Sequence, residues 1–291
     1  MEKKRKRLLF YSLLEIAIIL ALMGSLVALS LDTTVLNQQY LVKKSQTGTF
    51  VIEYRNIYND VLNYCAQSNG FSSQQIRHLT LTESQTKLLL KQTTQNFCAG
   101  RKQLANADTF TAMVEHNLES ALKKGSLKAT PQQLYNFHHI FAQDAALYFG
   151  IKFRRSGMMR VQQRYLIGRV VCRILMVGAL VVIGLILLIF YYSNERNIAK
   201  TFKLLELALP AAGLAVVLLA LVATMTNSSF AYQNSVYSFN SLYFKYLVEA
   251  QNMLWMLGGG LIILGSFIAF FRLSLFQDLM EAAQYNSNGH Y

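Results

Sequence analysis

Four long stretches of the chain are almost purely hydrophobic. Residues 174–192, 207–226 and 253–271 contain no charged residue, and residues 8–31 contain only one. A helix of about 20 apolar residues crosses the roughly 30 Å hydrocarbon core of a membrane, and each stretch has about that length. The pattern therefore predicts an all-α integral membrane protein with about four transmembrane helices.

Residues 32–165, between the first and second stretches, show a different pattern. Apolar residues recur there with the 3.6-residue period of amphipathic helices, and strand signals are almost absent. We expect an extramembrane helical bundle in this region. The predicted domains are a basic leader with the first transmembrane helix (residues 1–31), an extramembrane α-helical domain (residues 32–165) and three transmembrane helices with short connections (residues 166–291).

Start and stop signals divide the extramembrane domain into four helices. The first covers about residues 50–65, and the second runs from Thr82 to about Gly100. The third lies between Asp108, a plausible N-cap, and Gly125. The fourth starts at Thr130, which precedes a proline, and is expected to end at Gly150. Thr82 and Thr130 are each followed three residues later by glutamine, the pattern of a capping box.

The basic leader at residues 3–7 allows two interpretations, because signal peptides and membrane anchors both begin with positive charge. Residues 28–30, Ala-Leu-Ser, resemble a cleavage site. The apolar run that follows the leader, residues 8–31, is however longer than the roughly 7 to 15 residues of a signal core. We expect an uncleaved anchor.

The net charge of +13 would point to nucleic acid in a soluble protein. Here the basic residues crowd beside the apolar stretches, where anionic lipid headgroups lie, so we expect membrane lipids and not nucleic acid as partners. Seven of these residues precede the second stretch and form a candidate lipid or acidic-partner surface, with simple anchoring as the alternative. They are Lys152, Arg154, Arg155, Arg160, Arg164, Arg169 and Arg173.

The distribution of Lys and Arg in the connections predicts the orientation. The N-terminal tail is basic and the 193–206 connection contains three basic residues, whereas the 227–252 connection contains only Lys245. Both termini are therefore expected in the cytoplasm, with residues 32–165 outside the cytoplasmic (inner) membrane. The basic run before the second stretch opposes this assignment, although loops longer than about 60 residues cross largely regardless of charge. The opposite orientation would place the whole domain in the cytoplasm.

Cys65 and Cys98 lie in the predicted extracytoplasmic domain, where a disulfide between them is possible. Both lie near the C-terminal ends of their predicted helices, so a plain antiparallel pair would hold them roughly 20 Å apart. That distance is too long for a disulfide. A parallel arrangement would allow the bond, and the question stays open. Cys172 is expected to be an ordinary membrane-embedded thiol.

Glu15 is the one charged residue within the first hydrophobic stretch, and such residues usually face protein, water or a partner charge. Because it lies only two turns from Arg7, the alternative is a position at interface depth beside the basic leader. The segment from Tyr11 to Gly24, preceded by the basic residues 3–7, resembles the N-terminus of type IV prepilins. In that family the glutamate helps to align neighbouring subunits, which implies an assembly role for Glu15. Phe10, however, stands where the family has the glycine required for processing, and three further hydrophobic stretches replace the soluble head.

Other candidate sites are weaker. The glycines Gly258, Gly259 and Gly260 lie inside the last hydrophobic stretch, where small residues usually mark close packing of helices, within the chain or between subunits. Glu115, His116 and Glu119 form a carboxylate-histidine cluster on one predicted helix. One such group lacks the second pair that a bundle metal site uses, so we expect no metal.

The sequence contains no nucleophile elbow, phosphate-binding loop or zinc-spaced cysteine set, so we expect neither an enzyme nor a cofactor. The predicted function is a non-enzymatic interaction or sensory component of a membrane protein assembly, with other membrane subunits or copies of the chain as partners. The alternative is a permease subunit working with a separate ATPase, because the layout of spans is similar to that of FtsX-like transporters. That similarity concerns layout alone.

Overall fold

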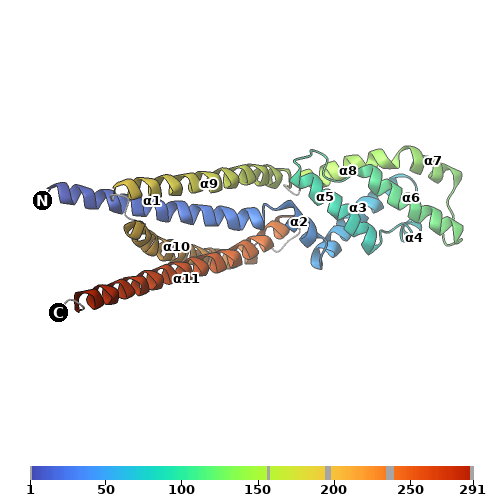
Figure 1. The fold of residues 1–291 in the computed structure, drawn as a ribbon. Coiled ribbons are helices and arrows are strands. Elements are labelled where there is room, and N and C mark those ends of the chain that lie inside the picture. Colours follow the sequence, from blue (N-terminus) through green and yellow to red (C-terminus); the bar gives the residue numbers. More distant parts are fainter. Residues whose placement is uncertain (1, 156–157, 194–197, 234–238, 289–291) are drawn as a thin grey trace. The chain divides into compact units, whose positions relative to one another are not determined.

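The structure, a computed structural model, describes residues 2–155, 158–193, 198–233 and 239–288, and in these residues the only regular secondary structure is the α-helix (Figure 1). The chain divides into two compact units. The span unit comprises Met1–Thr33, Val170–Gln233 and Leu247–Tyr291. The intervening unit comprises Thr34–Arg169 and Asn234–Tyr246.

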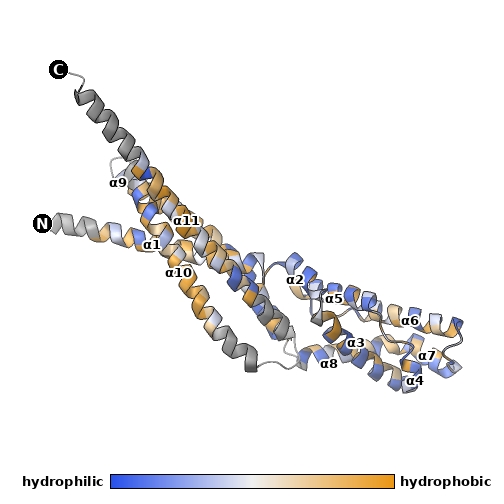
Figure 2. Ribbon diagram, turned by 90° about the horizontal axis from the view of Figure 1, so that it is seen from below, coloured by the Kyte–Doolittle hydropathy of each residue, from blue (hydrophilic) through white to orange (hydrophobic). Residues whose placement is uncertain are grey.

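Four long helices contain the predicted spans: α1 (Glu2–Thr33), α9 (Met158–Ser193), α10 (Ile198–Gln233) and α11 (Phe239–Asn288). Their segments Leu9–Thr33, Met158–Ser193, Thr201–Met225 and Val248–Ser274 are long and apolar enough to cross a membrane. Figure 2 shows hydrophobic residues along these segments, whereas hydrophilic and hydrophobic residues mix along the shorter helices. The predicted multi-pass, all-α membrane fold is confirmed.

In the span unit, α1 packs against the other three long helices. Ile18 of α1 is fully buried in a cluster with Phe190 of α9 and Ala208 of α10. Further along α1, Leu26 packs against a second cluster that includes Ala220 of α10 and Leu254 of α11. The first predicted span therefore forms part of the interior of this unit.

Helices α10 and α11 approach so closely that only glycine fits at their contact. A Cβ atom added to Gly213 of α10 would lie 2.6 Å from the carbonyl oxygen of Gly258 on α11. One added to Gly258 would lie 2.9 Å from the carbonyl oxygen of Gly213. Two turns further along α11, a Cβ atom on Gly265 would collide with the ring of Pro210. Backbone packing of this kind is a common way for membrane helices to associate.

Polar side chains of the span unit pair with groups on neighbouring helices. Nε of Arg272 on α11 lies 2.5 Å from a carboxylate oxygen of Glu206 on α10. The amide nitrogen of Gln251 on α11 donates to the carbonyl oxygen of Ala220 on α10 (3.2 Å) and contacts the hydroxyl of Thr224. The Ser30 hydroxyl of α1 donates to the carbonyl oxygen of Ala250 on α11. These contacts satisfy groups that would be costly to leave unpaired in hydrocarbon.

Seven shorter helices make up most of the intervening unit. They are α2 (Gln38–Ser45), α3 (Thr49–Ser68), α4 (Ser73–Ile76), α5 (Glu83–Cys98), α6 (Ala107–Lys123), α7 (Pro131–His139) and α8 (Phe141–Arg155). The predicted helices correspond to α3, α5, α6 and the pair α7 and α8. The predicted end at Gly150 is wrong, because α8 continues through Gly150, and the helix expected from Thr130 is divided at Ile140.

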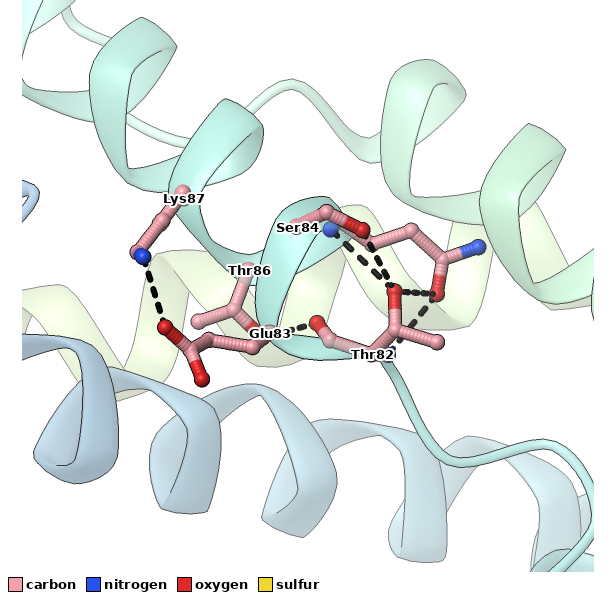
Figure 3. A network of polar contacts seen from close by, with 6 residues as sticks. Thr82, Glu83, Ser84, Thr86 and Lys87 are labelled. Carbon is pink, nitrogen blue, oxygen red and sulfur yellow. Dashed lines mark hydrogen bonds and ion pairs between the residues drawn. The ribbon is translucent and has the colours of Figure 1, made fainter.

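The predicted helix-start residues are correct for α5 and α7 and wrong for α6. Thr82 and Thr130 form the predicted capping boxes with Gln85 and Gln133. Figure 3 shows the first of these at the start of α5, beside an ion pair between Glu83 and Lys87 with an N···O distance of 2.6 Å. The predicted N-cap at Asp108 is wrong. Asn106 accepts the backbone N–H groups of Asp108 and Thr109 instead, so α6 starts earlier.

Aromatic side chains form much of the core of the intervening unit. The fully buried Tyr58 of α3 packs edge-on against Phe149 of α8, with ring centroids 5.8 Å apart. Phe110 of α6 packs between Phe149 and Phe141. The Tyr58 hydroxyl is hydrogen-bonded to the Thr93 hydroxyl of α5 at 2.9 Å, so its polar tip is satisfied inside the core.

Candidate functional site

A hollow of about 510 Å³ lies beside the C-terminal half of α8. We call it the α8 hollow. Its walls come from α8, from the loop after α5 and from the start of α9, and it lies entirely within the intervening unit. The lining residues are Lys102, Gln103, Leu104, Ala105, Ala146, Leu147, Phe149, Gly150, Ile151, Phe153, Arg154 and Met159.

The floor of the α8 hollow is hydrophobic and well packed from behind. Phe149 and Phe153, one turn apart on α8, stack with centroids 5.9 Å apart and an interplanar angle of 10°. Phe149 also packs edge-on against the core residue Phe110, at 5.1 Å. Leu104 and Ala105 are buried beside them. The core of the unit therefore supports the floor, which gives a bound molecule a firm apolar surface.

Two side-chain amides hold the loop that forms the opposite wall. Gln162 of α9, only 5% exposed, donates from its amide nitrogen to the carbonyl oxygens of Phe97 (3.0 Å) and Arg101 (3.1 Å). Asn96 of α5 donates to the carbonyl oxygen of Leu104 at 3.0 Å. The bonds to Arg101 and Leu104 satisfy loop carbonyls, whereas the Phe97 carbonyl belongs to α5 and also accepts the backbone N–H of Gly100. The wall is thus anchored on both sides.

Gly100 allows the chain to leave α5 and enter this loop. Its φ of +72° is a left-handed conformation, which glycine adopts without steric cost at helix ends. A Cβ atom at this position would also lie 2.8 Å from the Leu166 side chain of α9. The predicted helix end near Gly100 is confirmed, and the structure adds the close approach of α9 as a second reason for glycine.

Gly150 is the unusual residue of the hollow, because it lies inside a helix without a packing reason. A Cβ atom added there would have no heavy atom within 4 Å. Glycine in a helix interior costs about 0.5 to 1 kcal/mol relative to alanine. An unhindered glycine that lines a cavity has one evident structural effect, which is to leave the space above it empty.

The predicted basic surface is distributed over two helices. Lys152 and Arg154 lie on α8, whereas Arg160, Arg164, Arg169 and Arg173 lie on α9; the side chain of Arg155 is outside the described residues. Two of the charges have partners: Lys152 pairs with Asp60 at 3.2 Å, and Arg173 with Asp32 at 3.7 Å. Of the basic residues in this set whose side chains the structure describes, Arg154 is the one that lines the α8 hollow.

The predicted assembly residues lie in different environments. Gly258 packs against Gly213 of α10, so it serves packing within the chain, whereas a Cβ atom on Gly259 or Gly260 would have no heavy atom within 4 Å. Glu15 lies on α1, partly exposed, one turn before the buried Ile18. The side chains of the basic leader residues near Glu15 are outside the described residues.

One member of the carboxylate-histidine cluster, Glu115, contacts a histidine of another helix. Nδ1 of His138 on α7 lies 3.1 Å from a carboxylate oxygen of Glu115 on α6. Across the part of the chain that the structure describes, no three His, Cys, Asp or Glu side chains are grouped to hold a metal ion.

The three cysteines are free and buried, so the structure does not contain the possible disulfide between Cys65 and Cys98. Burial raises the pKa of the Cys65 thiol from 9.0 to about 12, and the nearby Asp144 carboxylate adds to this effect. Burial also raises the pKa of Cys98, against a smaller opposing effect of the Tyr165 hydroxyl. Both thiols are therefore protonated and poorly nucleophilic near neutral pH.

Sequence reasoning missed most of the α8 hollow. Of the described residues that line it, only Arg154 belongs to a predicted site, and Gly150 was expected to end a helix. The available signal was Gly150 itself, since an isolated glycine within a helical pattern usually has a packing or functional reason. Comparison of the chain with protein-family models, with curated proteins and with solved structures found no match.

Proposed function

We propose that the protein is a non-enzymatic, membrane-anchored component of a membrane protein assembly, and that the intervening unit binds a partner or ligand outside the cytoplasm. The span unit anchors the chain and packs it into the assembly. Both termini lie in the cytoplasm, as the basic N-terminal tail favours.

The observation that carries this proposal is the pairing of polar groups between the spans. A transport path needs polar groups that face a solute. Here the Glu206 carboxylate forms an ion pair with Arg272, and the Gln251 amide donates a hydrogen bond to a backbone carbonyl of α10. Gly213 and Gly258 close the contact between α10 and α11 at backbone distance. Such spans suit an anchor, whereas the intervening unit has its own aromatic core and a hollow that is open for binding.

The permease alternative assigns the contact with a partner protein to a different segment of the chain. It would use the connection over residues 194–205 to couple to a cytoplasmic ATPase, and residues 194–197 lie outside the described residues. The two proposals therefore differ in where a partner protein contacts the chain.

Photo-cross-linking in intact cells tests this difference. A photoreactive phenylalanine analogue would replace Tyr64, Leu88 or Tyr135, which are exposed on α3, α5 and α7, with the buried Tyr58 as the matched control. We expect a discrete protein adduct, identified by mass spectrometry, from one or two of the exposed positions and none from Tyr58. Adducts with an ATPase from residues 198–205, together with none from the exposed positions, would reject the proposal in favour of the permease.

Thiol labelling tests the orientation. Single cysteines replacing Ser126, which is exposed after α6, and Ser287 would be treated in intact cells with a membrane-impermeant maleimide. We expect labelling at position 126 at once and at position 287 only after lysis. The unmodified chain is the control, and its Cys65 and Cys98 should stay unlabelled near neutral pH because both thiols are buried and burial also raises their pKa. Labelling at 287 but not at 126 would place the intervening unit in the cytoplasm.

A further inference from the structure

We propose that the α8 hollow binds an anionic amphiphile, a molecule with a linear apolar body and a single negatively charged head, such as a fatty acid or an anionic phospholipid. The inference rests on the proposed function, because it names the ligand class that the intervening unit recognises. Three independent features of the hollow support it: an apolar floor, a cationic rim and an unfilled position at Gly150.

The apolar floor suits the body of such a molecule. Phe149 and Phe153 present stacked rings, and Leu104 is buried next to them in the opposite wall. Leu147 and Ile151 of α8 are largely exposed at the edge, where they extend the apolar surface. The volume of about 510 Å³ lies within the roughly 300 to 1,000 Å³ of small-molecule sites.

The charges around the rim have one sign. Lys102 of the loop and Arg154 of α8 both line the hollow, and none of the described residues that line it is acidic. Among the described residues, neither cation forms an ion pair with a carboxylate, in contrast to the neighbouring Lys152, which is held by Asp60. Two unneutralised cations at the mouth of an apolar cavity favour a ligand with a negative head over a neutral or cationic one.

Gly150 keeps the hollow accessible. A Cβ atom here would meet no other part of the protein, since no heavy atom lies within 4 Å of its position, and Gly150 lines the hollow. This position also supplies a blocking substitution that should leave the fold intact. Gly150→Leu fills the cavity and improves helix propensity at the same time.

Photolabelling of the full chain in phosphatidylcholine nanodiscs tests the inference. The probes are a long-chain fatty acid and a phosphatidylglycerol, each carrying a diazirine in the acyl chain, and the matching diazirine alcohol as the uncharged comparison. Adducts are mapped by peptide mass spectrometry. We expect labelling of the α8 peptide or the residue 102–105 loop by at least one anionic probe, and about tenfold less by the alcohol, as expected for a loss of about 1.4 kcal/mol.

The variants separate the contribution of shape from that of charge. Gly150→Leu and the double variant Lys102→Glu with Arg154→Glu should each reduce the labelling about tenfold. Lys91→Glu with Lys124→Glu, which reverses two exposed cations outside the hollow, should leave it unchanged. The circular dichroism spectrum of each variant checks that the helices are retained.

The outcomes distinguish the source of the ligand and the status of each proposal. Labelling by the fatty acid but not by the phosphatidylglycerol indicates a free single-chain ligand, and labelling by the phosphatidylglycerol indicates a membrane phospholipid; either outcome supports the site. Equal labelling by the alcohol, or labelling that persists in a folded Gly150→Leu variant, would overturn it. If no probe labels the hollow while the exposed positions still cross-link to a protein partner, the ligand class is wrong and the proposed function stands.

Discussion

Gly213→Leu is expected to force α10 and α11 apart and to destabilise the span unit strongly. The first atom of the new side chain would lie 2.6 Å from the carbonyl oxygen of Gly258 and 2.8 Å from the Ile262 side chain, so the two helices would have to separate. Overpacking of a close contact costs typically 1 to 3 kcal/mol, and we expect about 3 kcal/mol because the obstructing atom belongs to the backbone. The temperature of half-aggregation in mild detergent should fall by roughly 6 to 12 °C.

The glycine triplet on α11 provides the matched controls. Gly258→Leu should reproduce the effect, because a Cβ atom there would lie 2.9 Å from the carbonyl oxygen of Gly213. Gly259→Leu and Gly260→Leu should be tolerated, since neither position has a heavy atom within 4 Å of an added Cβ. If Gly259→Leu destabilises the monomer while Gly213→Leu does not, then α11 contacts α10 through a different face from the one described. If a leucine at Gly259 or Gly260 changes only the oligomeric state, those positions contact another subunit.

Arg272→Leu is expected to destabilise the same pair of helices by leaving the Glu206 carboxylate unpaired. The Glu206 side chain is 17% exposed and that of Arg272 is 34% exposed, so the pair is largely but not fully withdrawn from water. Breaking a fully buried pair costs about 3 to 5 kcal/mol. Solvent screening at Arg272 reduces this value, and we expect a loss of about 2 kcal/mol in the free energy of unfolding.

A double-mutant cycle isolates the interaction between the two charges. Glu206→Leu with Arg272→Leu removes both partners and should be more stable than Arg272→Leu alone, because no uncompensated charge remains. Unfolding of the full chain is followed for the wild type, both single variants and the double variant. We expect a coupling energy of about 1 to 2 kcal/mol. Strict additivity of the two single effects would show that the charges act independently.

The local features of the chain were predictable where neighbouring residues alone determine them. A run such as residues 207–226 identifies a span because a helix satisfies its own backbone in hydrocarbon, whatever its neighbours are. Thr82 and Thr130 identify helix starts because each side chain binds a backbone N–H three residues away. The error at Asp108 is also local, since Asn106 is an equally good cap and starts α6 earlier.

Tertiary packing decided the features on which the functional argument rests. The division between α7 and α8 at Ile140 is one example, because the sequence around Ile140 contains no glycine or proline that would end a helix. The same holds for Gly150, because only the arrangement of the loop after α5 and the start of α9 turns this helical glycine into the wall of a hollow.

By itself, the sequence determined that this is an all-α protein with four apolar helices able to cross a membrane, and where several of its helices begin and end. Only the tertiary structure decided which of these helices pair, that Gly213 meets Gly258, that Arg272 neutralises Glu206, and that Lys102 and Arg154 share one cavity. The physical reason is the range of the interactions. Hydrophobic length and helix capping act within one or two turns, whereas close packing, ion pairs and cavities join residues far apart in the chain.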